Sequence, residues 1–79
     1  MTRDEVADQI HGIIRETFDL DPDFPIDDDT TAMDIDGWDS LAHTTLLLMI
    51  ERQMSTKIDR DIEFDDVGAL IDNVHASVG

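Results

Sequence analysis

The sequence contains no cysteine and no tyrosine, and it has only five basic residues, two prolines and one tryptophan. Without cysteine the chain has no disulfide, no thiolate zinc site and no thiol chemistry of its own, which fits a reducing compartment. No apolar run is long enough to span a bilayer, and the first residues, MTRDEVADQI, lack the apolar core of a signal peptide. We therefore expect a cytoplasmic protein.

The scarcity of basic residues leaves a formal net charge of −15, from twenty acidic and five basic side chains. A field of this sign repels phosphate backbones and anionic lipid surfaces, which argues against nucleic acid and membranes as partners. It favours encounters with proteins that carry basic patches. The same charge also has the plainer effect of opposing aggregation.

The length of 79 residues, 41% of them hydrophobic, is enough for one small core, so we expect a single domain over residues 1–79. Apolar residues from position 6 to position 18 share one helical face and predict a first helix. Thr2 and Glu5 have the spacing of a capping box at its start. A second helix is predicted over residues 40–54, with Asp39 or Ser40 as its cap, and a last helix follows Asp65 and Asp66.

The segments between these helices are predicted from turn-forming residues and scattered hydrophobic ones. Residues 19–39 form a long loop, and residues 55–64 form a loop that ends in one short helical turn. The fold class is therefore all-α: a small bundle of three main helices plus a short fourth, with the long loop between helix one and helix two. The side chains expected to pin the long loop to the core are Leu20, Phe24, Ile26, Met33, Ile35 and Trp38.

Metal binding and hydrolytic chemistry are both weakly supported. An EF-hand register that starts at Asp19 places Phe24 where glycine is required and Thr30 where glutamate is required, so we expect no specific metal site. The three histidines have no ligand spacing and are expected at the surface. His43 follows Ser40 by three positions, but the chain has no Gly-x-Ser-x-Gly elbow and no evident oxyanion donors. We therefore predict that the protein is not an enzyme.

The sequence GWDSL before an apolar helix, in a small, acidic, cysteine-free chain, resembles the acyl and peptidyl carrier proteins over nearly its whole length. The resemblance implies that Ser40 receives 4′-phosphopantetheine from coenzyme A through a separate phosphopantetheinyl transferase. The thiol of that arm would replace the missing cysteine, and the carrier would be a monomer. A serine at a helix N-terminus also suits an attached phosphodiester, because free N–H groups and the helix dipole favour an anion. Asp39 is a supporting residue that either caps the helix or helps to hold the transferase's magnesium.

The same resemblance implies that Leu41 faces outward and docks into partners. Carriers of fatty acid synthesis display acidic side chains on the second helix, whereas this chain has Thr45, Leu48 and Arg52 there and retains only Glu51. Trp38 after Gly37 is found in many polyketide and peptide synthetase carriers; it either contacts partners or, as we favour, plugs the end of the bundle. The full set of predicted partner-contact residues is Trp38, Leu41, Thr44, Thr45, Leu48, Glu51 and Arg52.

The leading hypothesis is a carrier, closer to discrete polyketide and aminoacyl carriers than to the fatty acid carrier. It would hold an acyl or aminoacyl thioester on the arm of Ser40 for the enzymes of a specialised pathway. Its partners would be the transferase that attaches the arm, a ligase that loads the acyl or aminoacyl group, and a downstream transferase or synthase. The alternative is an acidic interaction module, an adaptor or decoy, without covalent modification.

Overall fold

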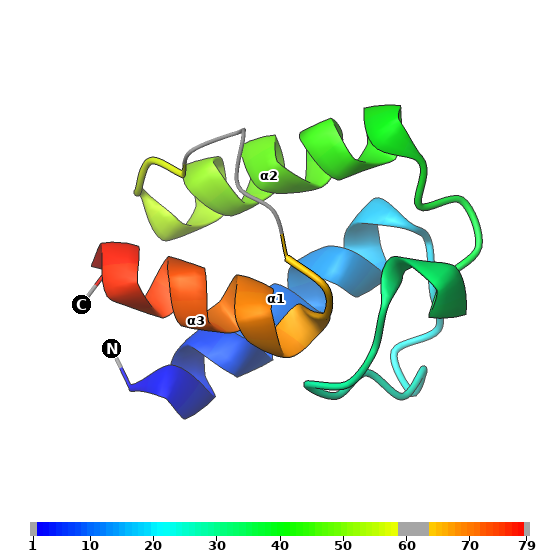
Figure 1. The fold of residues 1–79 in the computed structure, drawn as a ribbon, viewed down its shortest axis with the longest axis horizontal. Coiled ribbons are helices and arrows are strands. Elements are labelled where there is room, and N and C mark those ends of the chain that lie inside the picture. Colours follow the sequence, from blue (N-terminus) through cyan, green and yellow to red (C-terminus); the bar gives the residue numbers. More distant parts are fainter. Residues whose placement is uncertain (1, 59–63, 79) are drawn as a thin grey trace.

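The computed structural model describes residues 2–58 and 64–78 and contains three α-helices: α1 (Arg3–Thr17), α2 (Ser40–Met54) and α3 (Val67–Val78) (Figure 1). A single 3₁₀ turn, η1 (Ala32–Asp34), interrupts the long connection between α1 and α2. The predicted all-α class with a long first connection is confirmed. Residues 59–63, where most of the predicted short fourth helix falls, lie outside the described residues. Of the described helices, none has the length and apolarity required to cross a membrane.

Helices α1 and α3 begin where the sequence predicts. Thr2 Oγ1 accepts a hydrogen bond from the backbone N–H of Glu5 at 3.2 Å, and Glu5 Oε1 accepts one from the N–H of Thr2 at 3.0 Å. This reciprocal pair confirms the predicted capping box of α1. At α3, Asp66 is the cap, because its Oδ1 accepts from the N–H of Ala69 at 2.9 Å.

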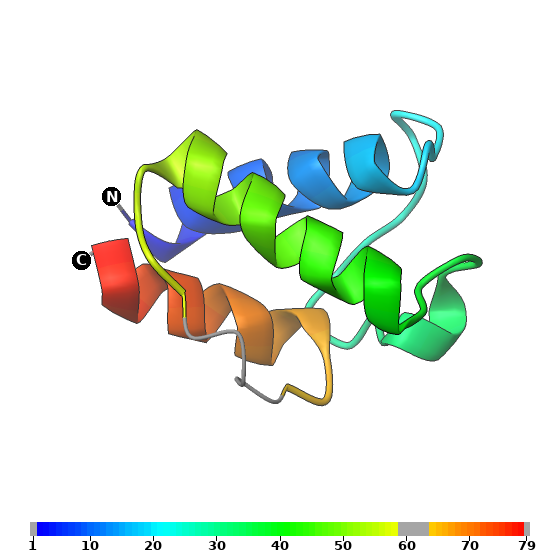
Figure 2. The ribbon, with the colours of Figure 1, turned by 90° about the horizontal axis from the view of Figure 1, so that it is seen from above.

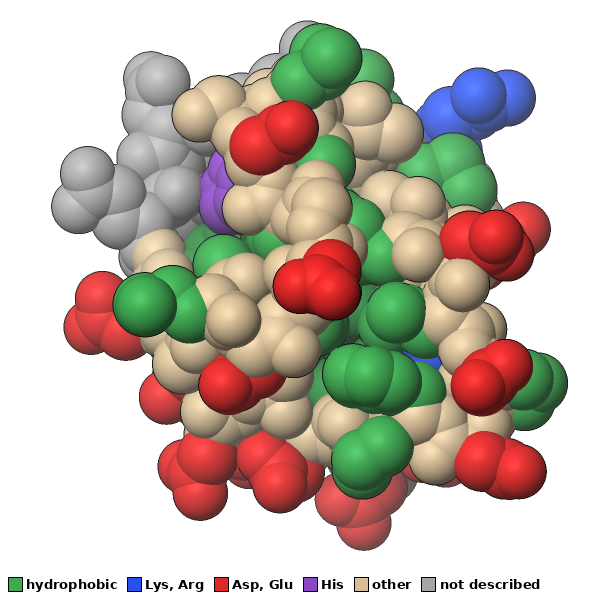
Figure 3. All heavy atoms as spheres, turned by 90° about the vertical axis from the view of Figure 1, so that its right-hand side faces the viewer, with side chains coloured by type: hydrophobic (Ala, Val, Ile, Leu, Met, Phe, Trp, Pro, Cys, Tyr) green, Lys and Arg blue, Asp and Glu red, His purple; other side chains and the backbone are tan. Residues whose placement is uncertain are grey.

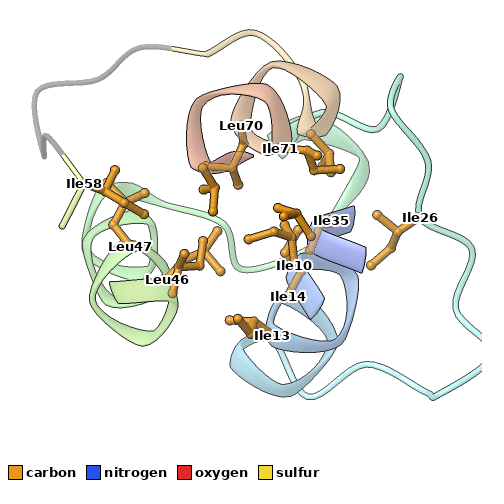
Figure 4. Close-up of a cluster of buried hydrophobic side chains, with 14 residues drawn as sticks. Ile10, Ile13, Ile14, Ile26, Ile35, Leu46, Leu47, Ile58, Leu70 and Ile71 are labelled. Atoms are coloured by element: carbon orange, nitrogen blue, oxygen red, sulfur yellow. The ribbon is translucent and has the colours of Figure 1, made fainter. Parts of the chain in front are cut away.

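The core lies between the three helices, with α1 packed against both α2 and α3. α2 runs antiparallel to α1, so the start of α2 lies at the same end of the molecule as the end of α1 (Figures 1 and 2). Aliphatic side chains fill the interior, mostly isoleucine and leucine (Figure 4). Those with no exposed surface are Val6, Ile10, Ile14, Leu46, Ile50, Val67, Leu70, Ile71 and Val74.

The long loop adds its own side chains to this core, as predicted, with one exception. Ile26 and Ile35 are buried, and Leu20, Phe24 and Trp38 pack against the cluster. The prediction for Met33 is wrong, because its side chain is 95% exposed. The turn η1 explains the difference: the Asp34 carboxylate accepts from Thr31 N–H at 2.9 Å and closes a single turn that leaves Met33 outside. No residue of η1 is buried, and the next residue, Ile35, supplies the buried apolar side chain instead.

A seam of backbone hydrogen bonds fixes the loop to the start of α3. The N–H groups of Val67 and Gly68 donate to the carbonyl oxygens of Thr30 and Asp28 at 2.8 and 2.9 Å. A Cβ atom on Gly68 would lie 2.9 Å from the Asp28 Cβ, so only glycine permits this approach. Arg3 adds an ion pair to Asp28 at 3.1 Å. The loop that leads to α2 is thereby held at its middle.

Candidate functional site

The start of α2 is set by a tight turn and a side-chain cap. Gly37 has a φ of +88°, a left-handed conformation that glycine adopts without strain, and its carbonyl oxygen accepts from the N–H of Asp39 at 3.0 Å. Asp39 Oδ1 then accepts from the N–H of Ala42 at 2.9 Å. Of the two residues that could cap the helix, Asp39 does so, and Ser40 is the first helical residue.

Ser40 is exposed, and the backbone around it suits a negatively charged substituent. Its own N–H and that of Leu41 have no acceptor among the described residues, as expected in the first turn of a helix. These donors, together with the positive end of the helix dipole, favour a phosphate ester on the hydroxyl. An accessible hydroxyl beside free N–H donors therefore fits the attachment of a phosphopantetheine arm.

Four aromatic rings gather behind Ser40, one each from the end of α1, the loop, α2 and the segment before α3. Trp38 stacks on Phe18 with ring centroids 5.2 Å apart, and His43 stacks on Phe64 at 5.0 Å. The indole N–H of Trp38 donates to His43 Nδ1 at 3.2 Å, which joins the two pairs. We call Phe18, Trp38, His43 and Phe64 the aromatic cluster. Trp38 is half-buried within it, as a residue that plugs the end of a bundle would be.

The surroundings of His43 bear on the possibility of a serine nucleophile. Its Nδ1 already accepts from the indole, and in the described parts of the chain no hydrogen bond joins His43 to Ser40. The prediction that all three histidines lie at the surface holds only in part, since His11, His43 and His75 are each half-buried. For His43 the reason is the aromatic cluster, which uses the imidazole as a fourth ring; no local sequence signal announces this role.

A pocket of about 500 Å³ opens beside Ser40. It lies between η1 and the first turn of α2, and the aromatic cluster contributes two of its rings to the wall. Thr44 Oγ1, on the same side, donates to the carbonyl oxygen of Ser40 at 3.2 Å. The lining residues are Ala32, Trp38, Asp39, Ser40, His43 and Thr44.

The predicted partner-contact residues divide into an exposed group and two half-buried residues, Trp38 and Glu51. Leu41 is 77% exposed and Leu48 is 37% exposed, and the polar members of the group share their outward position. Glu51 differs: it is half-buried, and its Oε2 accepts from the N–H of Ile58 at 3.2 Å, so this carboxylate holds the chain that follows α2. The exposed polar members are Thr44, Thr45 and Arg52.

The end of the molecule at which α2 begins shows acidic and hydrophobic side chains interspersed over its face, with few basic side chains (Figure 3). Met33 and Leu41, the two most exposed large hydrophobic side chains of the described residues, come from η1 and from the first turn of α2. Acidic density alone does not make a metal site here. Within residues 2–58 and 64–78, no three His, Asp or Glu side chains are arranged to hold a metal ion.

Comparison with solved structures finds a holo acyl carrier protein from Geobacter metallireducens, determined by solution NMR. The two structures align with a TM-score of 0.82 and 32% sequence identity, over 92% of this chain and 85% of the other. No family model matches the sequence. No curated protein matches it either.

This degree of identity over nearly the whole of both chains goes beyond a shared helical architecture. The chain belongs to the acyl carrier protein family. Its fold is that of a carrier rather than of a catalyst.

Proposed function

We propose that Ser40 carries 4′-phosphopantetheine and that the protein presents an acyl or aminoacyl group, held as a thioester on that arm, to the enzymes of a specialised biosynthetic pathway. The observation that carries the proposal is an exposed serine at the first position of α2, next to a capping aspartate, in a chain that belongs to the acyl carrier protein family. The similar structure from Geobacter metallireducens is described as a holo carrier.

The attachment requires a transferase and coenzyme A. Ser40 Oγ forms a bond to the phosphorus that bears the pantetheine, the pyrophosphate P–O bond breaks, and adenosine 3′,5′-bisphosphate leaves as the hydroxyl proton is lost. The chain's own contribution is to hold the hydroxyl outside the bundle and to direct two free N–H groups towards the new phosphodiester. The thiol at the end of the arm supplies the acyl-transfer chemistry that this cysteine-free chain lacks.

The outward face of α2 favours a specialised pathway over fatty acid synthesis. This face is made of Thr45, Leu48 and Arg52, and the one acid of the helix, Glu51, is engaged with the backbone of Ile58. An enzyme with a basic docking surface finds no exposed carboxylate on this helix, so charge complementarity with it is poor. An enzyme with an apolar docking surface finds Leu41 and Leu48.

The proposal is tested by incubating the protein with coenzyme A and a promiscuous phosphopantetheinyl transferase and measuring its intact mass. We expect one added phosphopantetheine on the wild-type protein and none on Ser40→Ala, with both proteins equally helical by circular dichroism. Folded wild-type protein that gains no mass would overturn the proposal. It would leave the acidic interaction module as the alternative, for which Ser40→Ala keeps both partner and activity.

The pathway is tested separately with the modified protein. We expect poor acyl transfer by a malonyl transferase of fatty acid synthesis, and a gain when Thr45→Glu and Leu48→Glu restore acids to the outward face. Gln9→Glu, an added acid on the exposed face of α1, is the matched control and should bring no gain. Efficient transfer to the unsubstituted protein would instead assign it to fatty acid synthesis.

A further inference from the structure

We propose that the pocket beside Ser40 is a seat for the first part of the prosthetic arm, in which the branched pantoyl group packs against Trp38 and His43. The inference rests on the proposed function, since it concerns the arm that Ser40 would carry. It assigns a ligand to a pocket of about 500 Å³, a volume within the range of ordinary small-molecule sites.

Position is the first argument. Ser40 itself lines the pocket, so a group bonded to Oγ begins at its edge. In phosphopantetheine the phosphate is followed within a few bonds by a carbon that carries two methyl groups, and then by a hydroxyl and an amide. The apolar, branched part of the arm is therefore the part that can reach the neighbouring wall without stretching, whereas the thiol and its cargo lie farther away.

The chemistry of the wall is the second argument. Trp38, His43 and Ala32 present two aromatic rings and a methyl group, which suit a dimethyl carbon. The ring nitrogen atoms joined by the Trp38–His43 hydrogen bond satisfy each other, so they need no partner from the arm. Because His43 Nδ1 accepts this hydrogen bond, the proton of the neutral imidazole is on Nε2, which is a donor.

Charge distinguishes the pocket beside Ser40 from a second pocket of the molecule. A pocket between α1 and the long loop is lined by five aspartates, Asp4, Asp8, Asp27, Asp28 and Asp29, together with His11 and with Arg3, which is ion-paired to Asp28. The net negative charge of this lining would repel a phosphodiester. The pocket beside Ser40 contains one carboxylate, that of Asp39, and its Oδ1 is already bonded to the N–H of Ala42. The phosphate can therefore lie at its edge, next to the free N–H groups of the first turn.

The wall is also held in place before the arm arrives. Trp38 is fixed by stacking on Phe18 and by its hydrogen bond to His43, and His43 is fixed by stacking on Phe64. A surface whose side chains are already ordered binds at a lower entropic cost than one that must order on contact. We therefore expect the pantoyl group to be ordered on the protein while the rest of the arm stays free.

The test uses wild-type protein modified with coenzyme A whose pantoyl methyl groups carry ¹³C, after mass spectrometry has shown that the arm is attached. In the folded protein we expect the methyl proton resonances to lie upfield of their positions in urea and to show nuclear Overhauser effects to the indole of Trp38. The indole is an unambiguous reporter because the chain has one tryptophan. Methyl shifts equal to those in urea, without contacts to the indole, would overturn the inference.

Variants separate the pocket from the aromatic cluster behind it. Trp38→Leu should abolish the upfield shift, whereas Phe64→Leu, which alters the same cluster without touching the pocket, should retain the methyl–indole contacts. Contacts that arise only after an acyl group is loaded would contradict a seat for the arm. Absence of any attached arm is seen first in the mass spectrum, and that result counts against the proposed function itself.

Discussion

Helices α1 and α2 have the same length, 15 residues, and both contribute fully buried side chains to one core, yet their outward faces differ. The exposed residues of α1 include carboxylates and no large hydrophobic side chain, namely Asp4, Glu5, Asp8, Gln9, Gly12 and Glu16. Those of α2 include two leucines and no carboxylate, namely Ser40, Leu41, Thr44, Thr45, Leu48, Arg52 and Gln53. Because folding requires only the inner faces, the outward face of α2 is available to contact other molecules. The outward face of α1 is exposed to solvent.

The inner faces should behave alike, and this comparison gives the largest expected effect. Ile10→Ala on α1 and Leu46→Ala on α2 remove side chains with no exposed surface. Each should lower the free energy of unfolding by about 2–5 kcal/mol, from lost burial and the cavity left behind. Urea titration followed by circular dichroism measures this. An unchanged free energy of unfolding in both variants would show that the core is not packed as described.

Removal of either helix cap should lower stability by a similar amount, but only one of the two substitutions should affect function. Thr2→Ala removes the capping box of α1, and Asp39→Ala removes the acceptor for Ala42 N–H in α2. Each should lower the free energy of unfolding by about 1 kcal/mol. Only Asp39→Ala should also slow pantetheinylation, because it loosens the turn that presents Ser40. The control is the transferase rate with Thr2→Ala, and an equal loss in both variants would assign the effect to stability alone.

The outward leucine of α2 should show the opposite pattern to the core. Leu41→Ala should change the free energy of unfolding by less than about 0.5 kcal/mol, since the side chain is 77% exposed. It should lower kcat/KM with the phosphopantetheinyl transferase by about fivefold, the equivalent of about 1 kcal/mol of lost contact. Gln9→Ala on the exposed face of α1 should alter neither quantity. An unchanged kcat/KM for Leu41→Ala would remove this residue from the contact face.

The smallest effect concerns the inner edge of α1, where His11 is half-buried and its Nε2 has no hydrogen-bond partner among the described residues. Burial, and then the positive charge of Arg15, lowers the pKa of His11 from its ordinary 6.5. The unfolded chain therefore binds this proton more readily, so stability is full above pH 6.5 and declines as the pH falls below it. His11→Leu should reduce this decline in Tm.

A second pH effect, from a carboxylate, is separable by its pH range. Hydrogen bonds from the backbone and hydroxyl of Thr2 lower the pKa of Glu5 below 4.5, so its contribution is present above that pH and is lost in stronger acid. The His11→Leu variant should retain this later loss. If the Tm of His11→Leu followed the same pH dependence as that of the wild-type protein between pH 6.5 and pH 4.5, His11 would be equally solvated in the folded and unfolded chain.

The sequence alone predicts the parts of this structure that have local signals. Hydrophobic periodicity and capping residues such as Thr2 and Glu5 predict the helices, because each signal lies within one turn of the element that it marks. The position of Ser40 at the start of a helix follows in the same way, since a capping residue and a helical pattern are both recognised within a few residues. The choice of Asp39 over Ser40 as the cap comes only from the structure.

The parts that the sequence does not predict depend on contacts between distant segments. Nothing near Met33 indicates that η1 turns it outward, and nothing near His43 indicates that a ring from before α3 stacks on it. Gly68 lies in the first turn of α3, where glycine is a poor helix former, and its presence is explained by the close approach of another segment of the chain. Its partner, Asp28, is forty positions away and is visible only in the fold.

The contrast between the two helices depends on Ser40 being the residue of α2 that other enzymes modify. The other serines of the chain are matched controls for this claim. Peptide mapping by tandem mass spectrometry after treatment with coenzyme A and a transferase distinguishes Ser40 from the other two serines, Ser55 and Ser77. We predict phosphopantetheine on the peptide that contains Ser40 and on neither of the others. An unmodified Ser40 in folded protein, or modification at another serine instead, would contradict the account.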